Sequence, residues 1–401
     1  MSNTLLNISM ITNESLIQLK NQLGFTKGVN RQYDDKFAKT GAKVGSVINI
    51  RKPVRFEVTD GAALNLQDVD DQSIPLTLDQ RKHVGFQFST QELTLSIDEF
   101  SDRYIKPAVT ALANKVDLSG LAEYKNVWNA VGTPGSTPTT LKTYLQAMQK
   151  LDENGAPVDD MRSIAINPAA QTEIVDALKG LFHDSNEVKK QYRRGRMGTA
   201  IGADWMMCQN INTHTVGAYG ANSPDVYLAG QTGSTINTDG WESGASTVNE
   251  GDIVTFAGVY AVNPQTRQST GQLMQFTVTA TISDTSGSIA LPISPAIVTS
   301  GPYQNVTNSP ANDATVTILG NASSVSPVNL AYHRDAFVLG CADLELPGGV
   351  DMAARATDPD SGLSIRLVRQ YDINNDTMPC RLDILYGWKT VYSELACRIH
   401  G

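Results

Sequence analysis

Hydrophobic and polar residues alternate along the chain from residue 47 to residue 58. The apolar side chains that share one parity there are Ile48, Ile50, Val54, Phe56 and Val58. A period of two predicts a β-strand with one apolar face and one polar face. Pro53 lies inside this stretch and has no N–H to donate, which favours a strand at the edge of a sheet.

A second alternating stretch begins at Val84 and continues to Ile97. The loop between the two stretches, residues 59–80, contains no lysine or arginine. Its aspartates are Asp60, Asp68, Asp70, Asp71 and Asp79. Loops of this length are uncommon inside compact domains and are usually functional. We therefore predict an extended hairpin with an acidic tip, and an ordinary surface hairpin is an equally weighted alternative.

Helical periodicity flanks the predicted hairpin on both sides. Before it, leucines at helical spacing predict a short helix in an N-terminal arm over residues 1–40. These leucines are Leu16, Leu19 and Leu23. After the hairpin, apolar residues at helical spacing from Phe100 to Ala122 predict a long helix that ends before Gly132. Pro107 is expected to kink or divide that helix.

The rest of the chain combines an α/β part with a block of short strands. A helix is predicted over 141–151, then a buried strand over 163–166, then a second helix that begins at Asn167-Pro168. Residues 231–330 are rich in Thr, Ser, Gly and Asn, which with short apolar runs predicts a small β-barrel or sandwich. The runs predicted as strands are Ile253–Val259, Leu273–Ile282, Ile289–Leu291 and Ala314–Leu319. This block interrupts an α/β host and is therefore predicted to be an inserted domain.

The composition excludes several classes of protein. Of the 401 residues, 41 are acidic and 32 are basic, which gives a formal net charge of −9. Binding of nucleic acid through bulk electrostatics needs an excess of Lys and Arg, so this mode is excluded. Charged residues make up 18% and hydrophobic residues 41%, which argues against disorder. No apolar run approaches the ~18 residues of a membrane-spanning helix, and no secretory signal is recognised at the start.

The sequence lacks the motifs of common enzymes. It contains no Walker-type phosphate loop, no His-Glu-x-x-His zinc helix and no Gly-x-Ser-x-Gly nucleophile elbow. His333, Arg334 and Asp335 form a polar cluster that could orient an imidazole, but a structural histidine is the stronger interpretation. We therefore predict no catalytic residue, no metal and no cofactor. The four cysteines form no C-x-x-C pair and are expected to be reduced thiols.

The densest positive patch lies between residues 189 and 196. Its members are Lys189, Lys190, Arg193, Arg194 and Arg196. Arginine binds carboxylates and phosphates through two parallel hydrogen bonds, so this basic cluster is a candidate contact for an acidic surface of a neighbouring subunit. A solvated turn is an equally weighted alternative.

Several local sequences together resemble one family. The strand–Asn–Pro–helix sequence at 163–168 and the stretch 193–205 are similar to the central domain of tailed-bacteriophage major capsid proteins. Residues 329–337 with 343–347, and residues 382–389, resemble podovirus-type coat proteins and are the most specific matches. The resemblance extends over nearly the whole chain. It implies an α+β fold of the Hong Kong 97 type, with an N-terminal arm, an extended hairpin, a long spine helix, peripheral and axial domains, and an inserted β-barrel.

The resemblance also implies a division of the chain and a function. The implied ranges are 1–40 for the arm, 41–97 for the hairpin and adjoining peripheral strands, 98–139 for the spine helix (itself about 98–131) and peripheral domain, 140–230 for the first axial part, 231–328 for the inserted barrel, and 329–401 for the C-terminal axial and peripheral part. The implied function is self-assembly through hexamers and pentamers into the icosahedral shell that encloses a phage genome. The shell would enclose its DNA without sequence-specific binding, as the net charge also suggests.

The contacts expected on this resemblance involve the hairpin and the basic cluster. The candidate intersubunit residues are Ile48, Ile50, Val54, Phe56, Asp68, Asp70, Asp71 and the five residues of the basic cluster. The family implies a scaffolding protein and a portal during assembly, with Glu14 as a candidate scaffold contact, and it leaves a decoration protein open. Members that cross-link their subunits use a hairpin lysine, which the 59–80 tip lacks, so no covalent cross-linking is predicted. The protein is expected in the virion, after assembly in the host cytoplasm and without membrane contact.

Two other classes remain as alternatives. One is a β-rich structural protein of a phage tail or adhesin, which the Thr/Ser/Gly-rich middle favours and the helical N-terminal half disfavours. The other is an enzyme with an unrecognised site, which only the cluster at His333 to Asp335 suggests.

Overall fold

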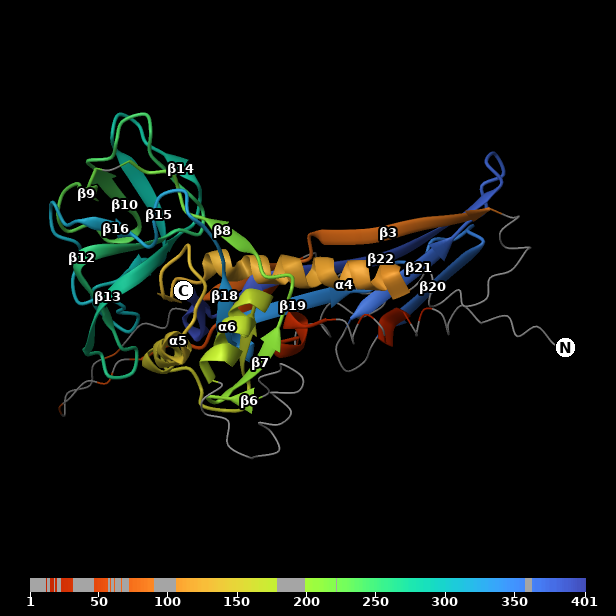
Figure 1. The fold of residues 1–401 in the computed structure, drawn as a ribbon, viewed down its shortest axis with the longest axis horizontal. Helices are drawn as coiled ribbons and strands as arrows, with labels where there is room; N and C mark the ends of the chain where they lie inside the picture. Colours follow the sequence, from red (N-terminus) through yellow and green to blue (C-terminus); the bar gives the residue numbers. More distant parts are fainter. Residues whose placement is uncertain are drawn as a thin grey trace. The chain divides into compact units, whose positions relative to one another are not determined.

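The computed structural model describes the chain in two compact units. The described residues are 12, 15–17, 19, 23–31, 47–56, 58, 61, 66, 72–89, 106–178, 199–220, 222–357 and 363–401. Unit 1 comprises Met1–Arg51, Ser73–Gly120 and Phe337–Lys389. Unit 2 comprises Lys52–Gln72, Leu121–Ala336 and Thr390–Gly401. Each unit combines helices with sheets, as an α+β fold requires (Figure 1).

Unit 1 is built on a long antiparallel sheet. Its strands are β3 (Gln80–Ser89), β19 (Phe337–Ala342), β20 (Met352–Thr357), β21 (Ser364–Arg369) and β22 (Thr377–Thr390). β22 is the longest strand and pairs with β3 over ten residues, from Thr377↔Ser89 to Tyr386↔Gln80. β21 pairs antiparallel with the middle of β22, from Arg366↔Asp383 to Arg369↔Cys380.

Helix α4 (Lys106–Leu121) packs along this sheet (Figure 1). Its Ser119 hydroxyl lies 3.0 Å from the Tyr386 hydroxyl, and a Cβ at Gly120 would collide with the Trp388 ring. The helix predicted over 98–131 is shorter at its end, because a 3-10 helix, η3 (Ala122–Asn126), follows directly. The predicted residues 98–105 lie outside the described residues.

The N-terminal arm is fastened to α4 by a buried carboxylate. Asp117 accepts hydrogen bonds from the Gly24 N–H (2.7 Å), the Thr26 N–H (3.1 Å) and the Thr26 hydroxyl (2.5 Å). The predicted leucine face is buried, because Leu16, Leu19 and Leu23 are all inaccessible. A short 3-10 helix, η1 (Phe25–Gly28), follows them.

The hairpin differs from the prediction in its returning strand. β1 (Val47–Arg51) pairs antiparallel with β2 (Ser73–Thr77), and the register places Ile48 opposite Leu76 and Ile50 opposite Ile74. The returning strand thus lies inside the stretch predicted as loop. The run that begins at Val84 belongs to β3 and pairs with β22 instead. The reason is one-sided burial, since Ile50 and Leu76 pack across β1 and β2 and are both buried.

The host part of unit 2 is a mixed six-stranded sheet with two helices. The strand order is β4 (Ala130–Val131), β23 (Ala396–Ile399), β18 (Asn329–His333), β5 (Arg162–Ile166), β7 (Ala203–Met207) and β6 (Thr199–Ala200). Helix α5 (Leu141–Glu153) buries one apolar face, and α6 (Pro168–Leu178) follows β5. The predicted Asn–Pro start of α6 is correct, because the Asn167 side chain accepts the Ala170 N–H at 3.0 Å as an N-cap.

The inserted part of unit 2 is an antiparallel sheet that closes on itself (Figure 1). Its strand order is β16 (Val316–Ile318), β12 (Ile253–Val262), β13 (Ser269–Val278), β15 (Ile289–Ile297), β10 (Gly233–Asp239) and β9 (Asp225–Val226). The first and last strands meet through the Val226 N–H to Ala314 carbonyl bond (3.0 Å) and the Val316 N–H to Pro224 carbonyl bond (2.9 Å). Apolar side chains of these strands, Phe256 and Phe276 among them, fill the interior.

Short elements complete the described chain. They are β8 (Thr213–Thr215) with β17 (Val325–Pro327), β11 (Thr247–Val248) with β14 (Ile282–Ser283), and the 3-10 helices η5 (Arg334–Ala336) and η6 (Ser393–Leu395). No helix in the described part of the chain has both the length and the apolar character needed to cross a membrane.

Candidate functional site

The structure divides the apolar face predicted for the hairpin. Ile48 and Ile50 are buried within the chain, so they have almost no surface left for a neighbouring subunit. Val54 is half-buried, whereas Phe56 is 64% exposed. The structure therefore favours Val54 and Phe56 over the two isoleucines as contacts. The remaining candidates lie outside the described residues, namely Glu14, Asp68, Asp70, Asp71, Lys189, Lys190, Arg193, Arg194 and Arg196.

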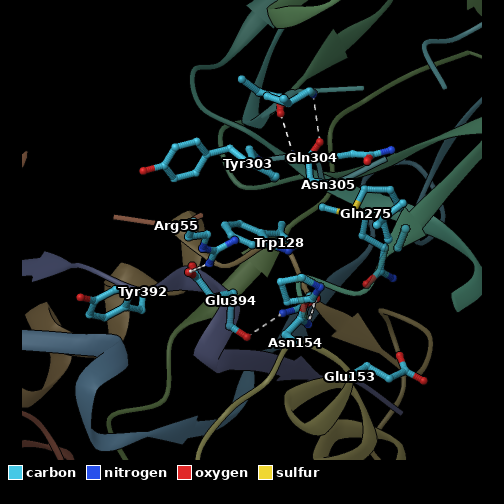
Figure 2. A pocket seen from close by; sticks show the side chains of 18 of the residues that line it. Arg55, Trp128, Glu153, Asn154, Gln275, Tyr303, Gln304, Asn305, Tyr392 and Glu394 are labelled. Atoms are coloured by element: carbon cyan, nitrogen blue, oxygen red, sulfur yellow. Dashed lines mark hydrogen bonds and ion pairs between the residues drawn. The ribbon is translucent and has the colours of Figure 1, made fainter. Parts of the chain in front are cut away.

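The residues that leave β1 lie against the C-terminal part of unit 2. The Arg55 guanidinium donates to Glu394 Oε1 at 3.1 Å, and the Lys52 ammonium lies 5.2 Å from the centroid of the Tyr392 ring. Figure 2 shows Arg55 pointing down to Glu394, with the Tyr392 ring beside it. Burial lowers the pKa of Lys52, and the Glu394 carboxylate opposes this effect. We call Tyr392 and Glu394 the hairpin cradle.

A cavity of about 330 Å³ lies under the segment from Lys52 to Arg55. Its walls come from this segment, from the host and from the inserted barrel (Figure 2). The amides that line it are engaged by nearby protein atoms. The Asn305 side chain accepts the Val298 N–H and donates to the Ala296 carbonyl, and the Asn154 side chain donates to the Lys150 carbonyl. These amide groups of the cavity wall are therefore engaged within the chain.

A buried arginine joins the host sheet to the inserted barrel. Arg398 of β23 is 1% exposed. Its guanidinium donates to the Gly251 carbonyl (2.5 Å), the Lys125 carbonyl (3.1 Å) and the Thr277 hydroxyl (3.0 Å). Gly251 and Thr277 belong to the inserted part, and Lys125 belongs to η3. Burial lowers the pKa of Arg398 to about 10, so the side chain remains charged at neutral pH.

An aromatic and acidic network surrounds this arginine. The Tyr124 ring centroid lies 5.2 Å from Arg398 Cζ, and the Tyr124 hydroxyl lies 3.0 Å from His214 Nδ1. His214 Nε2 lies 2.8 Å from Asp252 Oδ1, and the other oxygen of Asp252 accepts the Gly217 N–H at 3.0 Å. Host and barrel groups therefore satisfy one another in a buried position. We call these residues, with Arg398, the barrel latch.

Acidification is expected to destabilise unit 2 through His400, which is buried beside the barrel latch. Burial, together with the positive charge of Arg398, lowers the pKa of His400 to about 3. The unfolded chain therefore binds an extra proton between about pH 3 and the ordinary value of 6.5. Stability is complete above pH 6.5 and falls below it, by about 1.4 kcal/mol per pH unit for this one group.

This pH effect is measured by urea unfolding of wild type and His400→Asn at several values between pH 7 and pH 4. Other groups titrate in both proteins, so the difference between the two slopes isolates His400. We expect the variant to lose less stability on acidification than wild type. Parallel slopes would contradict the assignment.

The cluster suggested as an enzyme site is buried and hydrogen-bonded within the chain. His333 is buried, its Nε2 lies 3.2 Å from Asp159 Oδ1, and its Nδ1 accepts the Asp335 N–H at 3.3 Å. Both ring nitrogens are thus engaged. Within the described ranges, no group of three or more His, Cys, Asp or Glu residues could hold a metal ion. The four cysteines are free and buried, and burial raises the pKa of Cys380 to about 11 and of Cys397 to about 12, so neither is a thiolate at neutral pH.

Comparison with known proteins gives two kinds of similarity. A structure from Mycobacterium phage Che8 is similar with 14% identity and a TM-score of 0.47, over 94% of this chain and 90% of that one. The asymmetric unit of the bacteriophage PhiM1 mature capsid matches with 10% identity and a TM-score of 0.42, over 88% and 81%. The CUS-3 coat protein I-domain matches with 28% identity and a TM-score of 0.20, over 25% of this chain and 97% of that one. No curated protein matches the chain.

The family assignment rests on a family model that matches almost the full length of the chain. The model described as P22 coat protein, gene protein 5, matches residues 2–398, which is nearly the entire chain. This match agrees with the α+β fold described above and with the family that the sequence resembles. The chain belongs to the P22 coat protein family and is a major capsid protein that forms the icosahedral shell of a bacteriophage virion.

Proposed function

We propose that copies of this chain assemble through hexamers and pentamers, and that the hairpin of each copy lies across an adjacent copy. The observation that carries this proposal is a set of large apolar side chains left exposed on the hairpin. Phe56 is 64% exposed, Val58 is 91% exposed and Leu66 is 83% exposed. Exposed apolar groups gathered on one segment mark an interaction surface. Burying each such side chain contributes about 1.5–3 kcal/mol before the costs of association.

The charged contact between the hairpin tip and a neighbouring subunit is proposed from the sequence. The acidic tip, with Asp68, Asp70 and Asp71, would meet the basic cluster between Lys189 and Arg196 of a neighbour. Opposite charges at an interface mainly set register and exclude wrong partners. The 59–80 tip contains no lysine, so we propose a shell held by non-covalent contacts.

The proposal also includes the partners that act during assembly and the range of the inserted domain. We propose that a scaffolding protein and a portal take part in assembly in the host cytoplasm, with Glu14 as a scaffold contact, and that the chain has no catalytic activity. The genome would be enclosed without sequence-specific contact, as the net charge of −9 favours. The proposed inserted domain is 231–328, and the observed closed sheet begins slightly earlier, at β9.

Electron microscopy of the purified full-length chain, alone and with its scaffolding protein, tests this proposal. We expect closed shells in which every capsomer is a hexamer or a pentamer, with hairpins crossing subunit boundaries. Trimeric fibres would favour the tail or adhesin alternative. Small discrete particles that never close would contradict assembly through capsomers.

A further inference from the structure

The hairpin cradle holds the start of the hairpin at two points. The backbone around Glu394 is held by Asn129, whose side chain donates to the Glu394 carbonyl (3.3 Å) and to the Ala396 carbonyl (3.0 Å). The Glu394 side chain is 18% exposed, whereas that of Arg55 is 42% exposed. The acceptor therefore belongs to an anchored element, and the donor belongs to a surface segment. Lys52 over Tyr392 provides the second point.

The contacts of Lys52 and Arg55, three residues apart, together constrain the direction in which the segment between them runs. Between them, Pro53 and Val54 line the cavity of about 330 Å³. The Lys52 N–H donates to the Gln72 carbonyl at 2.8 Å, and beyond this bond the direction of the segment in unit 2 depends on the contacts of Lys52 and Arg55 with the hairpin cradle. Phe56 follows Arg55 directly, so this direction also determines where the exposed apolar residues point.

We infer that the hairpin cradle determines the angle at which the hairpin leaves the subunit, and that Glu394 and Arg55 thereby help to set the curvature of the shell. This inference rests on the proposed function, in which the hairpin crosses a neighbouring copy. The same angle is repeated in every copy, so a small change in it changes how the shell closes. Glu394 is a positioning residue here, because it acts on the neighbour only through the hairpin.

A charge-reversal cycle tests the pair. The variants are Arg55→Glu, Glu394→Arg and the double variant, each assembled under wild-type conditions and imaged by electron microscopy. Each single reversal places like charges together, and we expect the spread of shell diameters to increase about twofold or more. The double variant restores opposite charges and is expected to return to the wild-type spread. Thermal unfolding of the unassembled chains is expected to be unchanged, because exposed ion pairs add little stability.

A second measurement does not require assembly. Limited trypsin digestion of unassembled Glu394→Arg is expected to cleave after Arg55 about tenfold faster than wild type, because local opening controls cleavage. The matched control is Glu250→Arg, which reverses another exposed ion pair of unit 2, with Lys125 at 2.9 Å. This control is expected to leave both the shell diameters and the cleavage after Arg55 at wild-type values.

The outcomes separate this inference from the proposed function. Wild-type diameters in both single variants, a double variant as heterogeneous as the singles, an unchanged cleavage rate, or an equal effect of Glu250→Arg would each overturn the role of the cradle. None of these results affects the proposal that the hairpin binds a neighbour. That proposal fails separately if polar substitution of Phe56 leaves assembly intact.

Discussion

Replacement of Arg398 with alanine is expected to lower the free energy of unfolding by about 3–5 kcal/mol. The substitution removes the donors to the Gly251 carbonyl, the Lys125 carbonyl and the Thr277 hydroxyl, and it leaves these buried oxygens without that partner. It also creates a cavity between the host sheet and the inserted barrel. Urea unfolding of the unassembled chain at neutral pH, followed by tryptophan fluorescence, measures the loss.

Two variants make the result specific to the barrel latch. Arg398→Lys keeps the charge but lacks the planar guanidinium with its several N–H donors. It is therefore expected to restore only part of the stability that Arg398→Ala loses. Arg355→Ala removes a more exposed arginine, paired with Asp343 at 3.5 Å, and is expected to cost about 1 kcal/mol or less. A loss in Arg398→Ala no larger than in Arg355→Ala would show that the latch contributes little to stability.

Replacement of both Phe56 and Val58 with aspartate is expected to reduce the yield of shells about tenfold or more while the unassembled chain stays folded. Both side chains are exposed in the chain, so the substitution removes no internal packing. In an assembled shell it would place carboxylates against a desolvated apolar surface, which is strongly unfavourable. Sedimentation of assembly reactions measures the yield, and circular dichroism measures the folding of the chain.

The matched variants use the same hairpin. Phe56→Leu keeps the apolar character and is expected to assemble nearly as wild type. Ile50→Asp alters a residue that is buried within the chain, so it is expected to unfold the hairpin base and not to act at the interface alone. Normal shell yield in the Phe56 and Val58 double aspartate variant would refute the proposed hairpin contact.

The strands that could be predicted from the sequence are those that contain several apolar side chains. β12, β13, β15 and β16 overlap the predicted apolar runs, although β13 begins and ends four residues earlier than predicted and β15 continues six residues further. β10 was not predictable, because its sequence from Gly233 to Asp239 contains a single apolar side chain, Ile236, and its pairing depends on β15. β2 was missed for a related reason, since Pro75 divides a five-residue strand within a polar loop. In both cases neighbouring strands specify the structure and local propensity does not.

The residues of the candidate site were predictable only in part. The alternation placed Phe56 on one apolar face with Ile48 and Ile50, but β1 ends at Arg51, and whether an apolar side chain is covered within the chain depends on tertiary packing, as the two buried isoleucines demonstrate. Arg398 does leave a signal, because it is a charged residue inside the apolar strand Ala396–Ile399. The partners of Arg398 could not be predicted from the sequence, since Gly251 is 147 positions away. The same holds for the pair of Arg55 and Glu394, which are 339 positions apart.

The position of β23 has a consequence for the order in which a newly synthesised chain can fold. The strands of the closed barrel all lie between Asp225 and Ile318, so the barrel is complete while the ribosome is still adding the last part of the chain. The host sheet is not, because β23 lies between β4 and β18 and is made of residues 396–399. Until residues 396–399 have been synthesised, β4 lacks its parallel partner and β18 has an open edge, which is a surface prone to unwanted pairing. The nascent subunit thus carries a finished barrel on an unfinished host, and emergence of residues 396–399 from the ribosome permits both completion of the host sheet and closure of the barrel latch.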